Sequence, residues 1–206
     1  MLRNLFVFLL LAVPFAAARN DFRESYSETR PLHQGARLNI RWRVGDVRIV
    51  KGSDSNNIHI HYTVRSSSES AMKNAKVEFR GRDDEMTIEA RSSIHGNTAI
   101  DADIELPDQV NLDVRLKVGN LEVEDLVGDK DLAVSVGGIR VRGDDPASYR
   151  SVHAKTGIGD VEWTPPQGTQ ANAFRESGWL GHKVSYTSTG KYELRAEVSV
   201  GDIQLR

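Results

Sequence analysis

One short phrase occurs five times along this 206-residue chain: an apolar residue, a glycine, a small or acidic residue, and then apolar, polar and apolar residues. Its copies begin at Val44, Val118, Val136, Ile158 and Val200. On both sides of each glycine the residues alternate between apolar and polar, which is the period of a β-strand. Because helices do not tolerate this period together with so many glycines, the phrase predicts a repetitive all-β protein.

The spacing of the phrase leaves two all-β arrangements open. Gly119, Gly137 and Gly159 lie 18 and 22 residues apart, and Gly201 lies 42 residues beyond Gly159. About 20 residues is the size of one turn of a β-solenoid, so we expect a coil of parallel strands with glycine corners. The longer interval predicts a degenerate repeat over 168–190.

The alternative is an antiparallel β-sandwich or meander, in which each glycine phrase is a two-residue hairpin loop. Val118 would then face Leu121 across an antiparallel pair. Both arrangements place the flanking apolar residues on one face, so the pattern does not separate them. The even repeat length favours the solenoid, because a meander has no reason to keep one period.

Other segments follow the same alternation. Leu38 to Ile49 predicts two strands around the Gly45-Asp46 turn. Further strands are expected over 58–64, 77–79, 86–90 and 100–106, with a turn over 81–84 and a strand end at Pro107. One short helix is expected within 66–75.

The first 18 residues are typical of a secretory signal peptide. A positive start precedes the apolar run from Leu5 to Val13, and small residues allow cleavage between Ala18 and Arg19. The run is less than half of the roughly 20 apolar residues that span a bilayer, so no transmembrane segment is expected in the mature chain. We expect an exported protein in the periplasm, at the cell surface or secreted.

The mature chain is predicted to have two parts. Residues 19–37 are a polar N-terminal leader or a loosely joined edge strand, and residues 38–206 are a single β-repeat domain with its strongest repeats over 104–206. Without cysteine, the domain is held by its core alone. The 27 Lys and Arg and 29 Asp and Glu residues are interspersed, which argues against nucleic acid as a partner.

The repeats resemble a known family. The run Ile104-Glu105-Leu106-Pro107, the later phrases from Val118 onward and Thr156-Gly157 are similar to the bacterial putative-adhesin family of β-strand-repeat proteins (DUF4097-like). The resemblance covers roughly 38–206. It implies an exported, envelope-associated all-β protein built as a right-handed single-stranded β-helix, and the family has no established catalytic residues.

The residues themselves nominate no reaction centre. The chain has no cysteine and no Gly-x-Ser-x-Gly turn. Asp46, Asp160 and Asp202 would form a carboxylate column if they share one corner of a solenoid, but aspartate also follows glycine because it suits turns. We therefore expect no enzyme activity and no cofactor.

Two further groups of side chains could ligate a metal ion. Asp101, Asp103 and Glu105 share one strand face and could hold calcium, and His59 and His61 could hold zinc or copper. Neither group has the loop or the additional ligands of a recognised site. We interpret both as polar strand faces and expect no metal site.

An aromatic-rich segment offers the candidate ligand-binding residues. They are Trp163, Phe174, Trp179 and Tyr186. Aromatic faces bind sugars and apolar peptides, but they also serve to cap the open end of a repeat protein.

The sequence therefore predicts a non-enzymatic β-repeat protein with an adhesin-like role or an envelope binding or scaffold role. Its partner would be an envelope protein or a polysaccharide. One alternative is a small β-helix carbohydrate-active enzyme, and another is a self-associating envelope-stress accessory protein.

Overall fold

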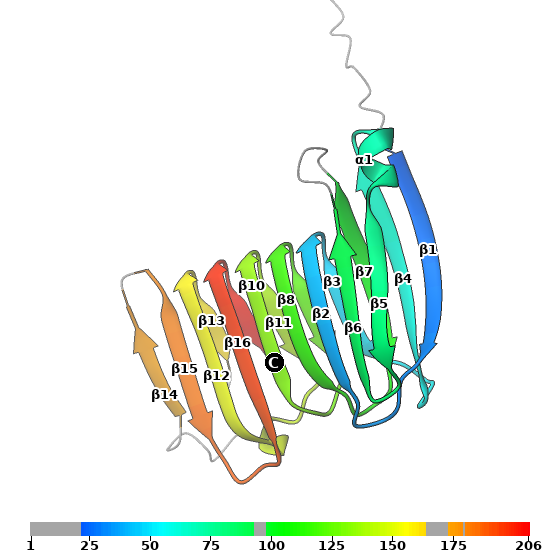
Figure 1. Ribbon diagram of the computed structural model, residues 1–206. Helices are drawn as coiled ribbons and strands as arrows, with labels where there is room; N and C mark the ends of the chain where they lie inside the picture. Colours follow the sequence, from blue (N-terminus) through cyan, green and yellow to red (C-terminus); the bar gives the residue numbers. More distant parts are fainter. Residues whose placement is uncertain (1–21, 93–97, 164–172, 179) are drawn as a thin grey trace, which may run out of the picture.

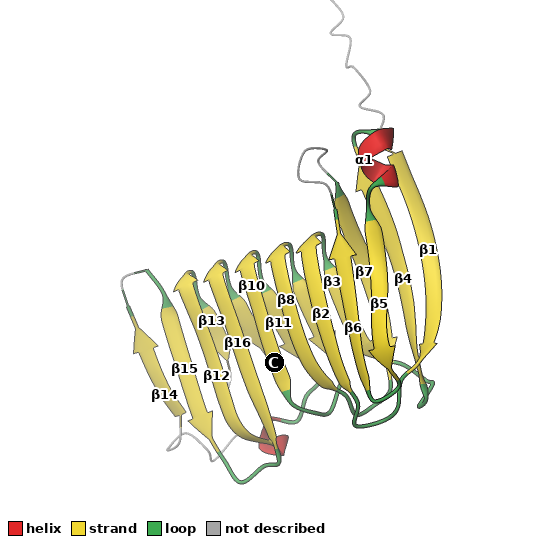
Figure 2. Cartoon of the chain, viewed as in Figure 1, coloured by secondary structure: helices red, strands yellow, loops and turns green. Residues whose placement is uncertain are grey.

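The computed structural model describes residues 22–92, 98–163, 173–178 and 180–206, which form two large β-sheets that face each other (Figure 1, Figure 2). Sheet A contains, in spatial order, β1 (Phe22–Pro31), β4 (Asn57–Ser66), β7 (Ala99–Leu106), β3 (Val47–Lys51), β9 (Leu121–Glu124), β11 (Ile139–Arg142), β17 (Ile203–Leu205) and β13 (Val161–Trp163). Sheet B contains β14 (Ala173–Ser177), β15 (His182–Thr187), β12 (Tyr149–Ile158), β16 (Tyr192–Val200), β10 (Lys130–Val136), β8 (Asn111–Val118), β2 (Arg37–Val44), β6 (Glu85–Arg91) and β5 (Lys76–Arg82).

The helical elements within these ranges are short. They are the α-helix α1 (Glu69–Lys73) and the 3-10 helix η2 (Pro146–Ser148). Among the described residues, no helix has the length and apolar character needed to cross a membrane.

Each copy of the glycine phrase joins a strand of sheet B to a strand of sheet A, and we call such a pair a rung. The glycine rungs are β2/β3, β8/β9, β10/β11, β12/β13 and β16/β17, and β6/β7 forms a sixth rung without the phrase. Neighbouring rungs pair in parallel and in register, so that Val118 pairs with both Val44 and Val136. Equivalent residues of the repeats therefore stack into columns.

The rungs do not follow the order of the sequence. β6/β7 lies outside β2/β3, and β16/β17 lies between β10/β11 and β12/β13. The parallel rungs are bordered by antiparallel strands, which are β4 and β1 in sheet A and β5, β15 and β14 in sheet B. Figure 1 shows this order directly, because strand colours do not run evenly from one end to the other.

The corner glycines form a column of touching backbones. Gly137 has a φ of +136°, and a Cβ placed on it would lie 1.9 Å from the carbonyl oxygen of Gly119. The corners on either side repeat this arrangement. A Cβ placed on Gly119 would lie 2.0 Å from the carbonyl oxygen of Gly45, and one placed on Gly201 would lie 1.8 Å from the carbonyl oxygen of Gly137. Only glycine combines this φ with so close an approach, so the phrase is a requirement of the corner.

The inward side chains of both sheets form one core. Leu38, Ile40 and Trp42 of β2 are buried, as the alternation along the strand requires. The indole Nε1–H of Trp42 donates to the carbonyl of Ile100 across the two sheets at 2.7 Å. A buried indole usually needs such a partner.

The structure confirms the all-β class and most of the expected elements, including the short helix and the strand that ends before Pro107. The hairpin register of the sandwich alternative is wrong. Val118 pairs with Val44 and Val136 and not with Leu121, because each phrase carries the chain from one sheet to the other. The two facing sheets match the sandwich alternative in layout, while the pairing between rungs is parallel.

The degenerate repeat predicted over 168–190 is also wrong in its described part. Phe174 on β14 and Tyr186 on β15 belong to an antiparallel pair of strands that extends the edge of sheet B beyond β12. No strand of sheet A follows β15 before β16 within the described residues. The long glycine interval therefore reflects an inserted edge hairpin and not a seventh rung.

Candidate binding site

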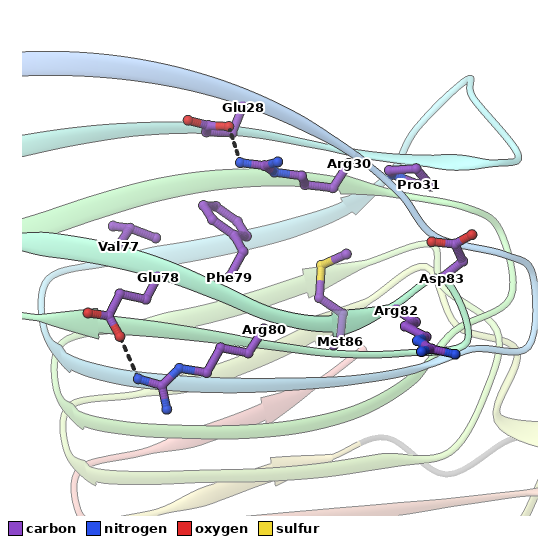
Figure 3. A pocket seen from close by; sticks show the side chains of 11 residues that line it. Glu28, Arg30, Pro31, Val77, Glu78, Phe79, Arg80, Arg82, Asp83 and Met86 are labelled. Carbon is purple, nitrogen blue, oxygen red and sulfur yellow. Dashed lines mark hydrogen bonds and ion pairs between the residues drawn. The ribbon is translucent and has the colours of Figure 1, made fainter.

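The open end between β1 and β5 forms a hollow of about 560 Å³ (Figure 3). The guanidinium of Arg30 lies over the ring of Phe79, 5.4 Å from its centroid, and forms an ion pair with Glu28 at 3.0 Å. Phe79 is half-buried and packs against the core. A cation over a half-buried ring covers apolar surface, so these residues close the end of the core.

The structure brings two of the four predicted aromatic residues together. The rings of Trp163 and Tyr186 pack with their centroids 5.2 Å apart, and Tyr186 is buried in the core. Phe174 on β14 is 61% exposed. Trp179 lies outside the described residues, as do Ala18 and Arg19 at the predicted cleavage site. The ligand-binding role of these aromatic residues stays a prediction.

The predicted aspartate column exists as a ladder of hydrogen bonds. Asp46 Oδ1 accepts the backbone N–H of Asn120 at 2.8 Å, and Asn120 Oδ1 accepts the N–H of Gly138 at 3.1 Å. Asp202 Oδ1 accepts the N–H of Asp160 at 2.8 Å, so each side-chain oxygen bonds the next rung. Stacked Asx side chains of this kind stabilise a repeat.

This ladder does not make a catalytic groove. Asp160 contacts His182 at 2.8 Å, but Asp46 lies on β2/β3, with the rungs β8/β9 and β10/β11 between it and Asp202. The three carboxylates therefore do not converge on one reacting atom, as an acid and base pair must.

Three of the five residues considered as metal ligands, Asp101, His59 and His61, have side-chain partners in the protein. Asp101 pairs with Arg65 through two bonds of 2.6 and 2.8 Å. His59 contacts Asp54 and Thr29, and His61 contacts Ser27. Within the described residues, no group of three His, Cys, Asp or Glu side chains is arranged to hold a metal ion.

A second hollow of about 570 Å³ lies on the outer face of sheet B, across β6, β2, β8 and β10. Its charged lining consists of five cations and one carboxylate: Arg41, Arg43, Arg91, Arg115, Lys117 and Glu89. Ala133 and Ser135 of β10 border the cations, and their small side chains leave the space open. This is the candidate site, which we call the basic hollow.

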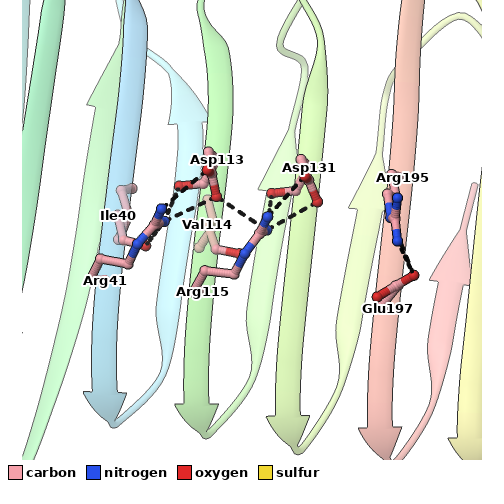
Figure 4. Close-up of polar contacts among 8 residues, drawn as sticks. All are labelled: Ile40, Arg41, Asp113, Val114, Arg115, Asp131, Arg195 and Glu197. Carbon is pink, nitrogen blue, oxygen red and sulfur yellow. Dashed lines mark hydrogen bonds and ion pairs between the residues drawn. The ribbon is translucent and has the colours of Figure 1, made fainter.

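Acidic residues pair with two of these cations, and Arg115 lies between the carboxylates of Asp113 and Asp131 (Figure 4). Arg41 forms two hydrogen bonds with the carboxylate of Asp113 at 3.0 and 3.1 Å, and Arg115 forms two with Asp131 at 3.0 and 2.8 Å. The hydrogen bond with Asp131 raises the pKa of Arg115. Such two-point pairs fix the planes of the guanidinium groups across neighbouring strands.

The basic hollow was not predicted from the sequence. Its residues come from four strands and are separated by up to 94 positions, from Arg41 to Ser135. A signal was present, since Arg41-Trp42-Arg43 and Arg115-Leu116-Lys117 occupy the same place before two copies of the glycine phrase. Only the register shows that these outward positions are side by side.

Comparisons with known proteins give distant matches. No family model matches the chain, and no curated protein matches it. A putative cell adhesion protein from Clostridium sporogenes is 16% identical with a TM-score of 0.48, over 88% of this chain and 99% of that chain. A putative adhesin from Parabacteroides distasonis is 12% identical with a TM-score of 0.29, over 88% of this chain and 70% of that chain.

A putative adhesin from Parabacteroides merdae is 7% identical with a TM-score of 0.26, over 89% of this chain and 96% of that chain. No family model confirms membership of the expected family. At these values the likeness identifies neither a ligand nor a site residue in this chain.

Proposed function

We propose that this chain is an exported, non-enzymatic β-repeat protein with an adhesin-like role in binding envelope components. The observation that carries the proposal is the basic hollow, where five cations gather around one carboxylate on an exposed sheet face. Carboxylates pair with three of the five cations, and Arg43 and Lys117 have no carboxylate partner among the described residues. A rigid sheet that displays such cations is suited to binding. The partner is an envelope polysaccharide or an envelope protein.

The carbohydrate-active enzyme is less well supported. Its proposed carboxylates, Asp46, Asp160 and Asp202, serve the ladder between rungs and do not surround a common point. The basic hollow has Glu89 as its one carboxylate, and Arg91 binds both oxygens of that group. A glycosidase needs two carboxylates on either side of the scissile bond.

Export is part of the proposal. Residues 1–18 form the signal peptide, with cleavage between Ala18 and Arg19, and residues 19–37 and 38–206 form the leader and the repeat domain of a solenoid-type protein. Mass spectrometry of the exported protein should find Arg19 as the first residue. An intact N-terminus in the cytoplasmic fraction would contradict export.

Binding is tested with purified residues 19–206 and envelope fractions in a sedimentation assay. We expect saturable binding at micromolar concentration that weakens as salt is raised, because the candidate surface is charged. Heat-denatured protein serves as the control for trapping. No binding to any envelope fraction would overturn the proposed function.

Self-association is a second candidate function, and a specific observation favours it. The residues just before the corner glycines form an exposed apolar ridge in register: Val44, Val118, Val136, Val200 and Ile158. Each is between 36% and 50% exposed. Two copies of this ridge have the same spacing and could pack against each other, as in a twofold dimer.

Light scattering tests this candidate. The wild-type chain would form dimers at high concentration, and the double variant Val118→Thr/Val136→Thr would stay monomeric, because threonine keeps the shape and removes apolar surface. A wild-type monomer at every concentration removes the candidate.

A further inference from the structure

Three cationic side chains stand next to one another on the outer face of sheet B. Trp42 pairs with Ala90 of β6 and with Leu116 of β8. Arg43, Arg91 and Lys117 follow these paired residues directly and point to the opposite face. Neighbouring strands lie about 4.8 Å apart, so three positive groups crowd a short row.

Such a row is unfavourable for the sheet itself, because like charges on neighbouring strands repel. Other parts of this face relieve the repulsion with carboxylates, as the pairs Arg41–Asp113 and Arg115–Asp131 show. Arg91 is likewise held by Glu89 at 2.9 and 2.8 Å. The face therefore neutralises charge where it can.

Arg43 and Lys117 are the exceptions. The guanidinium of Arg43 donates to the backbone carbonyl of Ser92 at 3.1 Å, and a carbonyl carries no net charge. Within the part of the chain that the structure describes, neither Arg43 nor Lys117 forms an ion pair. Two cations without a carboxylate partner among the described residues thus stand side by side, and an external anion would reduce the repulsion between them.

The space beside these cations is suited to an extended ligand. On the neighbouring strand β10, Ala133 pairs with Arg115 of β8. Ser135 is the next residue of β10 on the same face and also lines the hollow. The hollow is open to solvent and runs across four strands. An elongated chain that carries repeated negative groups can lie across it, with the Ser135 hydroxyl available for hydrogen bonds.

The lining favours an acidic polysaccharide over nucleic acid. Binding to single-stranded nucleic acid uses exposed aromatic rings on which bases stack. Trp42, the aromatic residue of the lining, is only 2% exposed and its indole N–H is already bonded. Sugar rings with carboxylate or sulfate groups need hydrogen-bond donors and cations, and this lining provides both.

We infer that the basic hollow binds an acidic polysaccharide, with Arg43 and Lys117 as its principal anion contacts. The guanidinium groups of Arg41 and Arg115, fixed by Asp113 and Asp131, border the same chain. This inference rests on the proposed binding function and specifies its ligand class.

The test uses the purified chain and two polymers with the same sugar backbone, polygalacturonate and its uncharged methyl ester. We expect calorimetry to show binding of the acid form and none of the ester, with affinity that falls as salt rises. The double variant Arg43→Gln/Lys117→Gln should lose about ten-fold in affinity, since it removes two charge-assisted contacts.

The matched control is Lys155→Gln/Lys183→Gln. These exposed lysines are paired on β12 and β15 of the same sheet, so the control removes equal charge away from the hollow. It should bind like the wild type. Urea unfolding of both variants checks that each remains folded.

Four results would overturn the inference. The first is a loss of affinity in the control variant equal to that of Arg43→Gln/Lys117→Gln, and the second is an affinity for the methyl ester equal to that for polygalacturonate. The third and fourth are tighter binding of a single-stranded oligonucleotide, or of vesicles that contain anionic lipid, than of polygalacturonate. If envelope fractions still bind while polygalacturonate does not, the ligand class is wrong and the proposed function stands. If neither binds, the proposed function fails as well.

Discussion

At the scale of single residues, the glycine phrase is explained by contacts between neighbouring rungs. Gly137 has no room for a Cβ because the carbonyl oxygen of Gly119 occupies that place. The residue after each glycine projects outward, and at Asp46, Asn120 and Asp202 its side-chain oxygen accepts an N–H of the next rung. The phrase therefore encodes both the corner and the bond between corners.

Gly137→Ala should destabilise the fold strongly. The new methyl group would push into the backbone of Gly119 and the φ of +136° would be strained. We expect a loss of about 3 kcal/mol or more in the free energy of urea unfolding. The control Gly35→Ala, with a φ of +80° and open space around it, should lose only about 1–2 kcal/mol. Equal losses would contradict the column of touching backbones.

The variants Asp46→Asn and Asp46→Ala test whether Asp46 stabilises the fold through its hydrogen bond in the ladder or through its negative charge. Asparagine keeps the Oδ1 that accepts the Asn120 N–H, so its unfolding free energy should match the wild type within about 0.5 kcal/mol. Alanine should lose about 1–2 kcal/mol, because the two hydrogen bonds that Asp46 Oδ1 accepts from the backbone N–H and the side-chain amide of Asn120 disappear. If asparagine were as damaging as alanine, the charge of Asp46 would matter and the ladder account would fail.

At the scale of elements, a buried polar cluster fixes the strands on either side of β16. The Lys130 ammonium of β10 donates to the Leu126 carbonyl, the Tyr149 hydroxyl and the Asp144 carboxylate at 2.7, 2.6 and 3.0 Å. Tyr149, at the start of β12, donates its hydroxyl to Asp144. Each member is useful only when the others are in place, so the cluster specifies how these elements pack.

Tyr149 of this cluster makes the free energy of unfolding decrease at alkaline pH. Burial, and then the Asp144 carboxylate, raise the pKa of Tyr149 far above its ordinary value, while burial lowers the pKa of Lys130. Tyrosine in the unfolded chain loses its proton near pH 10, whereas Tyr149 in the folded chain keeps it. Above that pH, deprotonation lowers the free energy of the unfolded state relative to the folded state. Tyr149 therefore contributes stability that is present below about pH 10 and is lost as pH rises further.

Tyr149→Phe removes that titration. Above pH 10 the unfolding free energy of the variant should fall less steeply than that of the wild type, by up to about 1.4 kcal/mol per pH unit. Near pH 7 the variant should be less stable by about 1–3 kcal/mol, because Asp144 and Lys130 each lose a hydrogen bond to the Tyr149 hydroxyl. Urea unfolding between pH 7 and pH 11 measures both effects. Identical slopes above pH 10 would show that Tyr149 is not held neutral by the fold.

At the scale of the whole molecule, the order of the rungs makes the fold cooperative. β16/β17 pairs with β10/β11 on one side and with β12/β13 on the other. The rung β12/β13 thus reaches the rest of the molecule through residues that come later in the sequence. A stack in chain order would have no such dependence, since each repeat would contact the one before it.

A variant that lacks residues 192–206 tests this dependence. We expect loss of the single cooperative urea transition and a marked loss of β-sheet circular dichroism. The reason is that Val134 of β10 and Ala154 of β12, both buried, would lose the strand that lies between them. Adding the missing peptide to the variant should restore part of the signal. A cooperative transition without residues 192–206 would show that the remaining rungs form an independent unit.

The elements were largely predictable from the sequence. Alternation identified the strands around Gly45, Gly119 and Gly137, and the serine-rich segment before Glu69 identified the short helix. These signals are local, because a strand period and a turn glycine depend on neighbours in sequence. The edge hairpin of β14 and β15 escaped prediction, since its pairing with β12 depends on distant residues.

The candidate site was not predictable in the same way. The sequence directed attention to Phe174 and Tyr186, and the structure places one on an exposed edge and the other in the core. The basic hollow depends on Arg43 and Lys117 being neighbours, and 74 positions separate them in the sequence.

The sequence by itself therefore determined the period, the corners and the class of fold, because these follow from backbone geometry over a few residues. Only the tertiary structure decided which rung lies beside which, and with it which charges are left without a counter-ion. Every rung offers the same backbone hydrogen bonds to its neighbours, so the repeat alone does not encode their order. That order is selected by particular long-range contacts, such as Trp42 with Ile100 and Lys130 with Asp144.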